Sequence, residues 1–346
     1  MIGGGVMGAA ALHYLAELGC ERPVLVERDT LASGSTGHCA GGVRTLFSDD
    51  LNAAICRESI ARLERFPEEV GQELDLRLDG YLFLLDDAED VARFRADGAE
   101  IVSAADALAR VPQLEVGGLV GAAFDARAGT VTPDLVVQGY VRRAAERGAH
   151  VEQSCAATAI LADGGRVTGV QTTRGTIATE HVVLAAGAWS RELHELPVVP
   201  ERRFMFFTED APGFPAALPL TIDFSTGFYF HREGGGLAFG GREQSLEELA
   251  PVAARRLPAL ADLGVRSSWW GFYEMSPDHN ALVGAAADPE GLVYATGFSG
   301  HGFQQGPVIG EHLARLSLGL ATAFDLSAFD AARFASGTAR VERNVV

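Results

Sequence analysis

The sequence predicts a mixed α/β fold that contains a parallel sheet. Three observations support this prediction. A glycine-rich turn, an apolar helical pattern and a short apolar strand follow one another within residues 3–27. Residues 150–181 alternate apolar and polar positions between glycine turns, as a small antiparallel meander does. Apolar runs that begin at Val182 and Leu292 each lead into a turn of small residues, as buried strands do.

The composition excludes several classes of function. The chain has 346 residues, of which 47% are hydrophobic and 21% charged, as in ordinary globular proteins. Its formal net charge is −18 and it has no basic stripe, which argues against a nucleic-acid partner. All 28 basic residues are arginine, which excludes chemistry that needs a lysine amine.

The cysteines give no sign of a metal site. Cys20, Cys39, Cys56 and Cys155 show neither CxxC spacing nor a neighbouring group of histidines. The sequence also shows no secretory signal, lipidation motif or apolar segment long enough to cross a bilayer. We therefore expect no bound metal, no transmembrane segment and a cytoplasmic location with free thiols.

The first motif, GxGxxG at residues 3–8, has the order that a dinucleotide-binding fold requires. A helical pattern follows it and ends at Gly19, and the strand at 24–26 closes on an acid, Glu27. The glycines allow a tight turn, a close approach to the pyrophosphate and close packing of the helix, whose N-terminus attracts phosphates. The acid accepts hydrogen bonds from the ribose hydroxyls. The residues predicted to bind the dinucleotide here are Gly3, Gly5, Val6, Met7, Gly8, Glu27 and Arg28.

The strand that should precede this motif is short. Only Met1 and Ile2 stand before Gly3, where about five apolar residues would form the central strand of the sheet. We expect the true start to lie upstream, and the chain as numbered to hold its cofactor weakly.

Two other stretches are rich in small residues and suit close contact with a ligand. The loop at 33–44 combines glycines with hydroxyl side chains, and the turn at 297–307 leads from a strand into a helix, which favours an anion. The turn after the strand at Val182 adds a third contact. The cofactor-binding residues predicted in these segments are Ser35, Thr36, Gly41, Gly42, Val43, Ala186, Gly187, Trp189, Gly297, Gly300, His301, Gly302, Phe303 and Gln304.

With the segment Tyr273–His279, these motifs resemble the D-amino-acid oxidase-like (DAO) superfamily of FAD-dependent oxidoreductases. The resemblance covers almost the whole chain. It is strongest to the branch that contains sarcosine oxidase, dimethylglycine oxidase and the proline dehydrogenase β-subunit. It implies that the cofactor is FAD.

The resemblance also implies a discontinuous layout. An FAD-binding domain on a parallel sheet would comprise residues 1–75, 133–200 and 272–346. A substrate-binding domain on a large mixed or antiparallel sheet would comprise residues 76–132 and 201–271. The sequence agrees independently, because residues 80–85, 227–231 and 236–240 have strand patterns and lie outside the nucleotide-binding segments.

In this superfamily, the flavin N5 takes a hydride from the carbon beside the substrate nitrogen, and water hydrolyses the resulting imine. The resemblance therefore implies oxidation of the C–N bond of an amino acid or of a secondary or N-methyl amine. The helix that begins near Gly302 would stabilise the anion of the reduced flavin. By analogy, the residues expected to act in catalysis are Arg44, Tyr229, Arg242 and His301, and those expected to bind substrate are His231, Tyr273 and Gln304.

Three positions depart from monomeric sarcosine oxidases. Gln304 and Ala238 stand where those enzymes have lysines that serve carboxylate binding and oxygen activation. Phe272 replaces the cysteine that holds the flavin covalently, so we expect FAD to be bound noncovalently. The missing lysines favour a dehydrogenase that passes electrons to a partner other than oxygen, unless Arg242 supplies the charge.

Alternatives remain open from the sequence. The same fold could host a D-amino-acid or 2-hydroxy-acid dehydrogenase, or a non-catalytic FAD protein that assists respiratory-complex assembly. An NAD-dependent dehydrogenase is the weakest hypothesis, because it leaves the middle and C-terminal motifs unexplained. The electron acceptor could be oxygen or an electron-transfer partner, and the chain could be one subunit of a hetero-oligomer.

Overall fold

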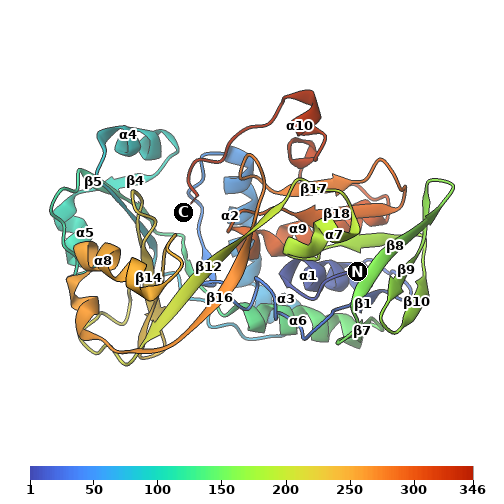
Figure 1. Ribbon diagram of the computed structural model, residues 1–346, viewed down its shortest axis with the longest axis horizontal. Helices are drawn as coiled ribbons and strands as arrows, with labels where there is room; N and C mark the ends of the chain where they lie inside the picture. The colour runs from blue at the N-terminus through green and yellow to red at the C-terminus, as the bar shows by residue number, and fades with distance from the viewer. Residues whose placement is uncertain (346) are drawn as a thin grey trace.

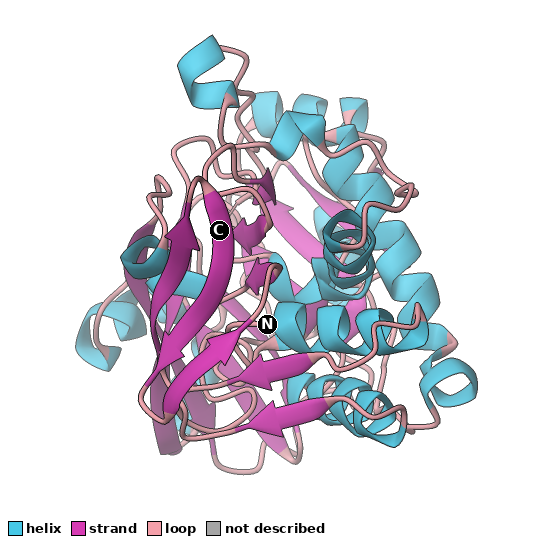
Figure 2. Cartoon of the chain, turned by 90° about the vertical axis from the view of Figure 1, so that its right-hand side faces the viewer, coloured by secondary structure: helices cyan, strands magenta, loops and turns pink. Residues whose placement is uncertain are grey.

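Two sheets form the frame of the protein, and the two long strands at one edge of the second sheet, β12 and β16, run diagonally across the middle of the molecule (Figure 1). The structure is a computed structural model that describes residues 1–345. The view in Figure 2 shows most long helices on one side and many of the strands on the other. The mixed α/β fold predicted from the sequence is confirmed.

The first sheet brings together strands from the N-terminal, middle and C-terminal parts of the chain. Ile2 forms parallel bridges to Val26 and Leu184, so it occupies the centre of the sheet although it contributes a single bridging residue. β18 pairs in parallel with β11 and antiparallel with β17. The strands of this sheet are β1 (Val24–Val26), β7 (His150–Glu152), β11 (Val182–Leu184), β17 (Leu282–Ala285) and β18 (Leu292–Thr296).

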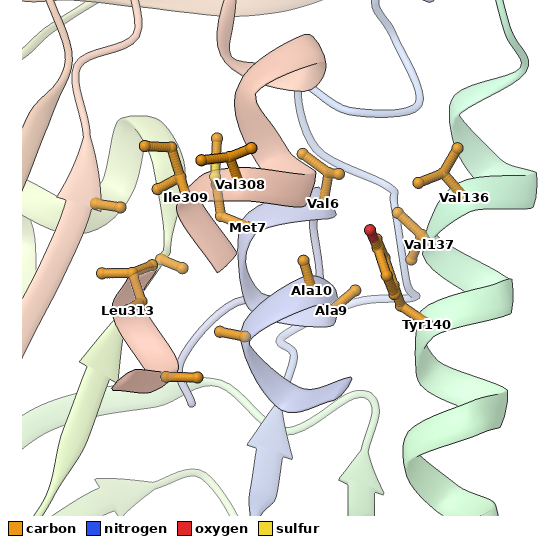
Figure 3. Close-up of a cluster of buried hydrophobic side chains, with 14 of the residues drawn as sticks. Val6, Met7, Ala9, Ala10, Val136, Val137, Tyr140, Val308, Ile309 and Leu313 are labelled. Carbon is orange, nitrogen blue, oxygen red and sulfur yellow. The ribbon is translucent and has the colours of Figure 1, made fainter. Parts of the chain in front are cut away.

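Helices α1 (Val6–Glu17), α6 (Pro133–Glu146) and α9 (Gly302–Ser317) pack beside this sheet (Figure 3). α9 approaches α1 closely because it presents glycines. A Cβ added to Gly306 would lie 2.5 Å from Val6 Cγ2, and one added to Gly310 would lie 2.3 Å from Ala10 Cβ. The remaining helices of this part are α2 (Asp50–Glu64), α3 (Phe66–Val70), α7 (Ser190–Leu193) and α10 (Arg333–Ser336), with 3₁₀ turns η1 (Gly187–Trp189) and η3 (Ser327–Phe329).

The meander predicted between residues 150 and 181 is present as a separate antiparallel sheet. It consists of β8 (Ala157–Asp163), β9 (Arg166–Thr172) and β10 (Gly175–Ala178), with β9 in the middle. In Figure 1 it extends from the end of the molecule where the N-terminus lies.

The second sheet has the order β16-β12-β15-β14-β13-β3-β5-β4, and all its neighbours are antiparallel except β13 and β3. Buried phenylalanines at 228, 230 and 239 fill the core on one face. The strands are β3 (Tyr81–Leu85), β4 (Glu100–Val102), β5 (Gly121–Asp125), β12 (Val199–Thr208), β13 (Leu220–Asp223), β14 (Tyr229–Glu233), β15 (Gly236–Gly240) and β16 (Val265–Met275). The helices here are α4 (Ala88–Ala96), α5 (Ala104–Arg110) and α8 (Leu246–Arg256), with the 3₁₀ turn η2 (Pro258–Asp262).

A short ribbon of β2 (Gly42–Val43) and β6 (Gly129–Thr130) stands apart from both large sheets. The ends of β12 and β16 near residues 199–203 and 271–275 pair with each other. The division into two domains remains a prediction. Among residues 1–345, no helix is both long and apolar enough to cross a membrane.

Candidate active site

One cavity of about 610 Å³ is enclosed where the glycine-rich segments meet the ends of β12 and β16. Cavities that hold cofactors and small ligands have volumes of about 300–1,000 Å³. Its walls come from segments far apart in the sequence, namely 2–7, 26–28, 33–44, 185–193, 203–205, 271–274 and 298–304.

At one end, the turn before α1 forms a cradle of backbone. Gly3 has φ +107°, and a Cβ there would lie 2.3 Å from the Ala185 carbonyl oxygen. A Cβ on Gly8 would lie 1.9 Å from the Gly3 oxygen. The Thr36 hydroxyl accepts a hydrogen bond from the Val6 amide at 3.1 Å. Because the first turn of a helix has amides without intrahelical acceptors, this end of the cavity favours an anion.

Glu27 completes the cradle. Its carboxylate accepts hydrogen bonds from the amides of Gly4 at 2.7 Å and Asp29 at 2.8 Å, so its orientation is fixed while it lines the cavity. The Arg28 guanidinium stacks 3.7 Å from the centre of the Trp189 ring, and both residues line the cavity wall.

At the other end, the side chain of Arg44 is held by backbone carbonyls. Its guanidinium donates to the oxygen of Leu46 and, at 2.7 Å, to that of Asn344, and it stacks 4.0 Å from the Phe47 ring. Its own amide donates to Gln304 Oε1 at 2.7 Å. Arg44 is only 6% exposed, yet its acceptors are neutral, so its charge remains available to an anionic ligand.

Three tyrosines line the same end: Tyr81 is buried, and Tyr229 and Tyr273 are partly buried. Burial raises the pKa of each hydroxyl, so all three stay protonated at neutral pH and can donate hydrogen bonds. Gly300 lies against the ring of Tyr273, because a Cβ there would be 2.4 Å from ring atom Cε2. The glycine at 300 therefore lets the turn pack against Tyr273.

His301 lines the cavity, but both its ring nitrogens have partners. Nε2 lies 3.1 Å from the His279 carbonyl oxygen, and Nδ1 lies 3.3 Å from the side-chain nitrogen Nε2 of Gln305. These partners assign the proton to Nε2. Burial, followed by the charge of Arg44, lowers the pKa of His301 to about 4, so the imidazole is neutral at physiological pH.

Three comparisons with known proteins bear on this site. Residues 1–316 match the family of FAD dependent oxidoreductases. The chain belongs to this family. FAD-dependent oxidoreductase domain-containing protein 1 of Xenopus laevis is 30% identical, with 100% of this chain and 84% of that protein covered. Human mitochondrial sarcosine dehydrogenase is 28% identical over 96% of this chain, which spans only 41% of that enzyme.

Among solved structures, L-proline dehydrogenase from P. horikoshii superimposes with a TM-score of 0.90 at 27% identity, with 98% of both chains covered. The expected relationship to the DAO family is thereby confirmed, and the cofactor is FAD. The cradle fits this assignment, because the glycines at 3 and 8 leave no space for side chains and Glu27 is positioned for a ribose. Within residues 1–345, no group of three metal-ligating side chains is found.

Most residues predicted to bind FAD lie on the cavity wall. They are Gly3, Gly5, Val6, Met7, Glu27, Arg28, Ser35, Thr36, Gly41, Gly42, Ala186, Gly187, Trp189, Gly300, His301, Gly302, Phe303 and Gln304. Gly8, Val43 and Gly297 do not lie on this wall. Gly8 packs against Gly3. Val43 is completely buried in the hydrophobic core that also contains Val6. Gly297 sits in left-handed backbone (φ +69°) against Leu282.

Two predicted substrate-end residues lie outside the cavity. Arg242 does not line the cavity: β15 ends at Gly240, the chain bends at Arg242, and its exposed side chain lies beside Gly227. Its expected catalytic role stays a prediction. His231 also lies away from the cavity, two residues and about 6.7 Å along β14 from Tyr229. Its Nδ1 contacts the Arg232 carbonyl, and burial lowers its pKa to about 4.

The sequence did not single out Glu274. Its Oε2 is buried without a hydrogen-bond partner among the described residues, and it lies 2.9 Å from the position of a Cβ on Gly187. Burial raises its pKa to about 7, opposed only in part by a hydrogen bond from the Phe298 amide. An acid in the second half of β16, where the other residues from Trp269 to Met275 are uncharged, was the available signal.

A C-terminal segment, residues 340–344, also supports the site. The Glu342 carboxylate is buried and accepts hydrogen bonds from the amides of Ser48, Asp49 and Asn344. It also accepts one from the Asn52 side chain at 3.1 Å. The Asn344 carbonyl accepts a hydrogen bond from Arg44. The segment therefore connects the start of α2 to the end of the cavity that Arg44 and the three tyrosines line.

Proposed function

We propose that the protein oxidises the C–N bond of an N-substituted or cyclic amino acid, with FAD bound noncovalently. The observation that carries this proposal is the continuity of the FAD cradle with an end formed by Arg44, Tyr81, Tyr229 and Tyr273 in one cavity. The relatives named for sarcosine and L-proline support the same substrate class.

In this mechanism FAD supplies a two-electron acceptor for the hydride on the carbon beside the substrate nitrogen. The substrate loses that hydride and an N–H proton and becomes an imine, and water then converts the imine to an amine and a carbonyl compound. Arg44 binds the substrate carboxylate through its buried guanidinium, and Gln304 fixes the backbone of Arg44. The tyrosine hydroxyls donate hydrogen bonds and exclude bulk water.

His301 is a positioning residue in this scheme. With its proton on Nε2 and both nitrogens bound, it cannot exchange a proton with the substrate without breaking this network. It packs against Phe47 with ring centres 5.3 Å apart, and Phe47 in turn lies beside Arg44. His301 thus holds the surface on which the guanidinium rests.

The electron acceptor is also part of the proposal. Ala238 is buried among apolar neighbours, and Arg242 lies outside the cavity, so neither residue places a positive charge on the cavity wall. We propose a dehydrogenase that passes electrons to a partner, which could be another subunit of a hetero-oligomer, in the cytoplasm.

The decisive experiment follows the flavin absorbance of the purified FAD-containing protein during anaerobic addition of sarcosine, proline, D-amino acids and 2-hydroxy acids. Bleaching by the secondary amines, with slow return of colour in air, is the expected result. Bleaching by primary D-amino acids or hydroxy acids alone would replace the proposal with that dehydrogenase activity. A yellow protein that no compound bleaches would indicate a non-catalytic FAD protein.

A further inference from the structure

The substrate end of the cavity contains a second arginine, Arg203. It lies on β12 opposite Gly271, lines the cavity, and its side chain is only 14% exposed. Its guanidinium carbon lies 5.0 Å from the centre of the Tyr273 ring. The buried Nε has no hydrogen-bond partner among the described residues. Because a guanidinium nitrogen is a strong donor, an unpartnered one in a cavity wall indicates a missing acceptor.

The two arginines lie on either side of a row of tyrosines. The charge of Arg44 acts on the Tyr81 hydroxyl, that of Arg203 acts on Tyr229, and both act on Tyr273. In each case the positive charge opposes the rise in the tyrosine pKa that burial causes. Tyr273 is therefore within electrostatic reach of both guanidinium groups, and one ligand can contact both.

The carboxylates near the two arginines leave guanidinium donors free for a ligand. Buried Glu342 acts on Arg44 only from a distance, since the charge of Arg44 contributes to the lowered pKa of Glu342. Arg44 makes no ion pair with a described carboxylate. Arg203 pairs through Nη1 with Glu201 at 2.5 Å, but the Glu201 side chain is 48% exposed, and solvent weakens such a pair. Glu274 does not balance them, because neither arginine influences its pKa. The guanidinium donors that these contacts leave free on Arg44 and Arg203 can each bind one carboxylate of a ligand in the cavity.

We propose that the substrate is a dicarboxylic secondary amine, with one carboxylate bound by Arg44 and the other by Arg203. This inference rests on the proposed oxidation of secondary amines and narrows it to N-carboxyalkyl amino acids. Carboxylates at both ends hold the amine in the middle of the row of tyrosines. Monocarboxylic amines such as sarcosine then occupy only the Arg44 half of the site.

Binding can be measured without turnover. Thiodiglycolate has a carboxylate at each end and a sulfur in place of the amine. The matched compound with one carboxylate is (methylthio)acetate, a thioether called methylthioacetate below. Titration of the FAD-containing protein with each, followed by flavin difference spectra, gives their dissociation constants. We expect thiodiglycolate to bind about tenfold or more tightly than methylthioacetate, in line with one added charged hydrogen-bonding group.

Arg203→Gln should remove the preference for the diacid and leave the affinity for methylthioacetate unchanged. The matched control is Arg202→Gln. Arg202 precedes Arg203 on β12 but is exposed and stacks on Trp270 at 4.6 Å, so both affinities should be unaltered. If Arg203→Gln leaves diacid binding unchanged, or weakens both compounds equally, Arg203 merely supports Tyr273 and the inference is overturned.

Anaerobic reduction separates this inference from the function on which it rests. Iminodiacetate should reduce the flavin at lower concentration than sarcosine. Reduction by sarcosine or proline, with no advantage for iminodiacetate, would overturn the dicarboxylic substrate and leave amine oxidation intact. If no amine reduces the flavin, the proposed function fails, and any preference for thiodiglycolate would then describe an anion site alone.

Discussion

The two ends of the cavity are built in different ways. The FAD cradle consists mainly of backbone: glycines at 3, 5 and 8 and the first turn of α1, steadied by Thr36 and Glu27. The other end consists of long side chains from β3, β12, β14 and β16 together with Arg44, which the C-terminal segment holds in place. A cradle of backbone suits one cofactor, whereas side chains on a rigid sheet can be exchanged to suit different substrates.

The largest expected effect comes from giving the cradle a side chain. Gly3→Ala would bring a Cβ to 2.3 Å from the Ala185 oxygen at φ +107°, and we expect the purified protein to lose its FAD. We also expect a loss of about 3 kcal/mol or more in stability, because strain at positive φ and overpacking act together. Flavin absorbance per protein and urea unfolding measure both effects.

The control for that change is Gly19→Ala. Gly19 also has a positive φ, +86°, but a Cβ there would meet nothing within 4 Å. This variant should keep its full FAD content and lose only about 1–2 kcal/mol. If both variants lost FAD equally, strain from the positive φ would explain the loss, and the contact of the added Cβ at residue 3 with Ala185 would not.

At the substrate end, Arg44→Gln should lower kcat/KM by roughly 100-fold, since a charged hydrogen bond to a carboxylate contributes about 1.5–3 kcal/mol. FAD content should change little, because the cradle is at the other end. Arg242→Gln is the matched control, since Arg242 is exposed and lies outside the cavity. If Arg242→Gln had the larger effect, the assignment of the carboxylate-binding residue would have to be withdrawn.

Glu342→Gln tests whether the C-terminal segment positions Arg44. The new amide group would face the donors Asp49 N–H or Ser48 N–H, and we expect a loss of about 2 kcal/mol in the free energy of unfolding. KM should rise several-fold while kcat changes less, because the Asn344 carbonyl no longer holds the guanidinium firmly. Val341→Ala is the control, since that side chain is 59% exposed. A fall in stability with no change in KM would limit Glu342 to a structural role.

The smallest effect concerns Glu274 and depends on pH. Its pKa is about 7 in the folded protein, against an ordinary value of 4.5, so between these values the folded state binds a proton that the unfolded state lacks. Stability from this group is therefore complete below about pH 4.5 and is lost as pH rises through 7. In the FAD-free protein, Glu274→Gln should have no advantage at pH 5 and gain about 1–3 kcal/mol at pH 8. If the difference in the free energy of unfolding between Glu274→Gln and the unchanged protein were the same at both pH values, Glu274 would not be a buried carboxyl without a partner.

The same contrast explains what the sequence could predict. The cradle depends on spacing within residues 3–27, and each glycine has a local reason to be there, so it can be identified without knowledge of the fold. Arg203 enters the cavity only because β12 pairs with β16, in a register that brings it opposite Gly271. No local pattern marks such a pairing. The position of Arg242 outside the cavity wall could not be predicted either, because the pattern does not reveal that β15 ends at Gly240.

The close contact of α9 with α1 has a consequence for how the protein is made. The turn at residues 3–8 and helix α1 are synthesised well before their neighbours at Ala185, Gly306 and Gly310. Such pairing of distant segments slows folding, because long loops must close before their contacts form. Until α9 has been synthesised, the nascent chain lacks part of the wall around its nucleotide, and we expect FAD to be captured only after that point.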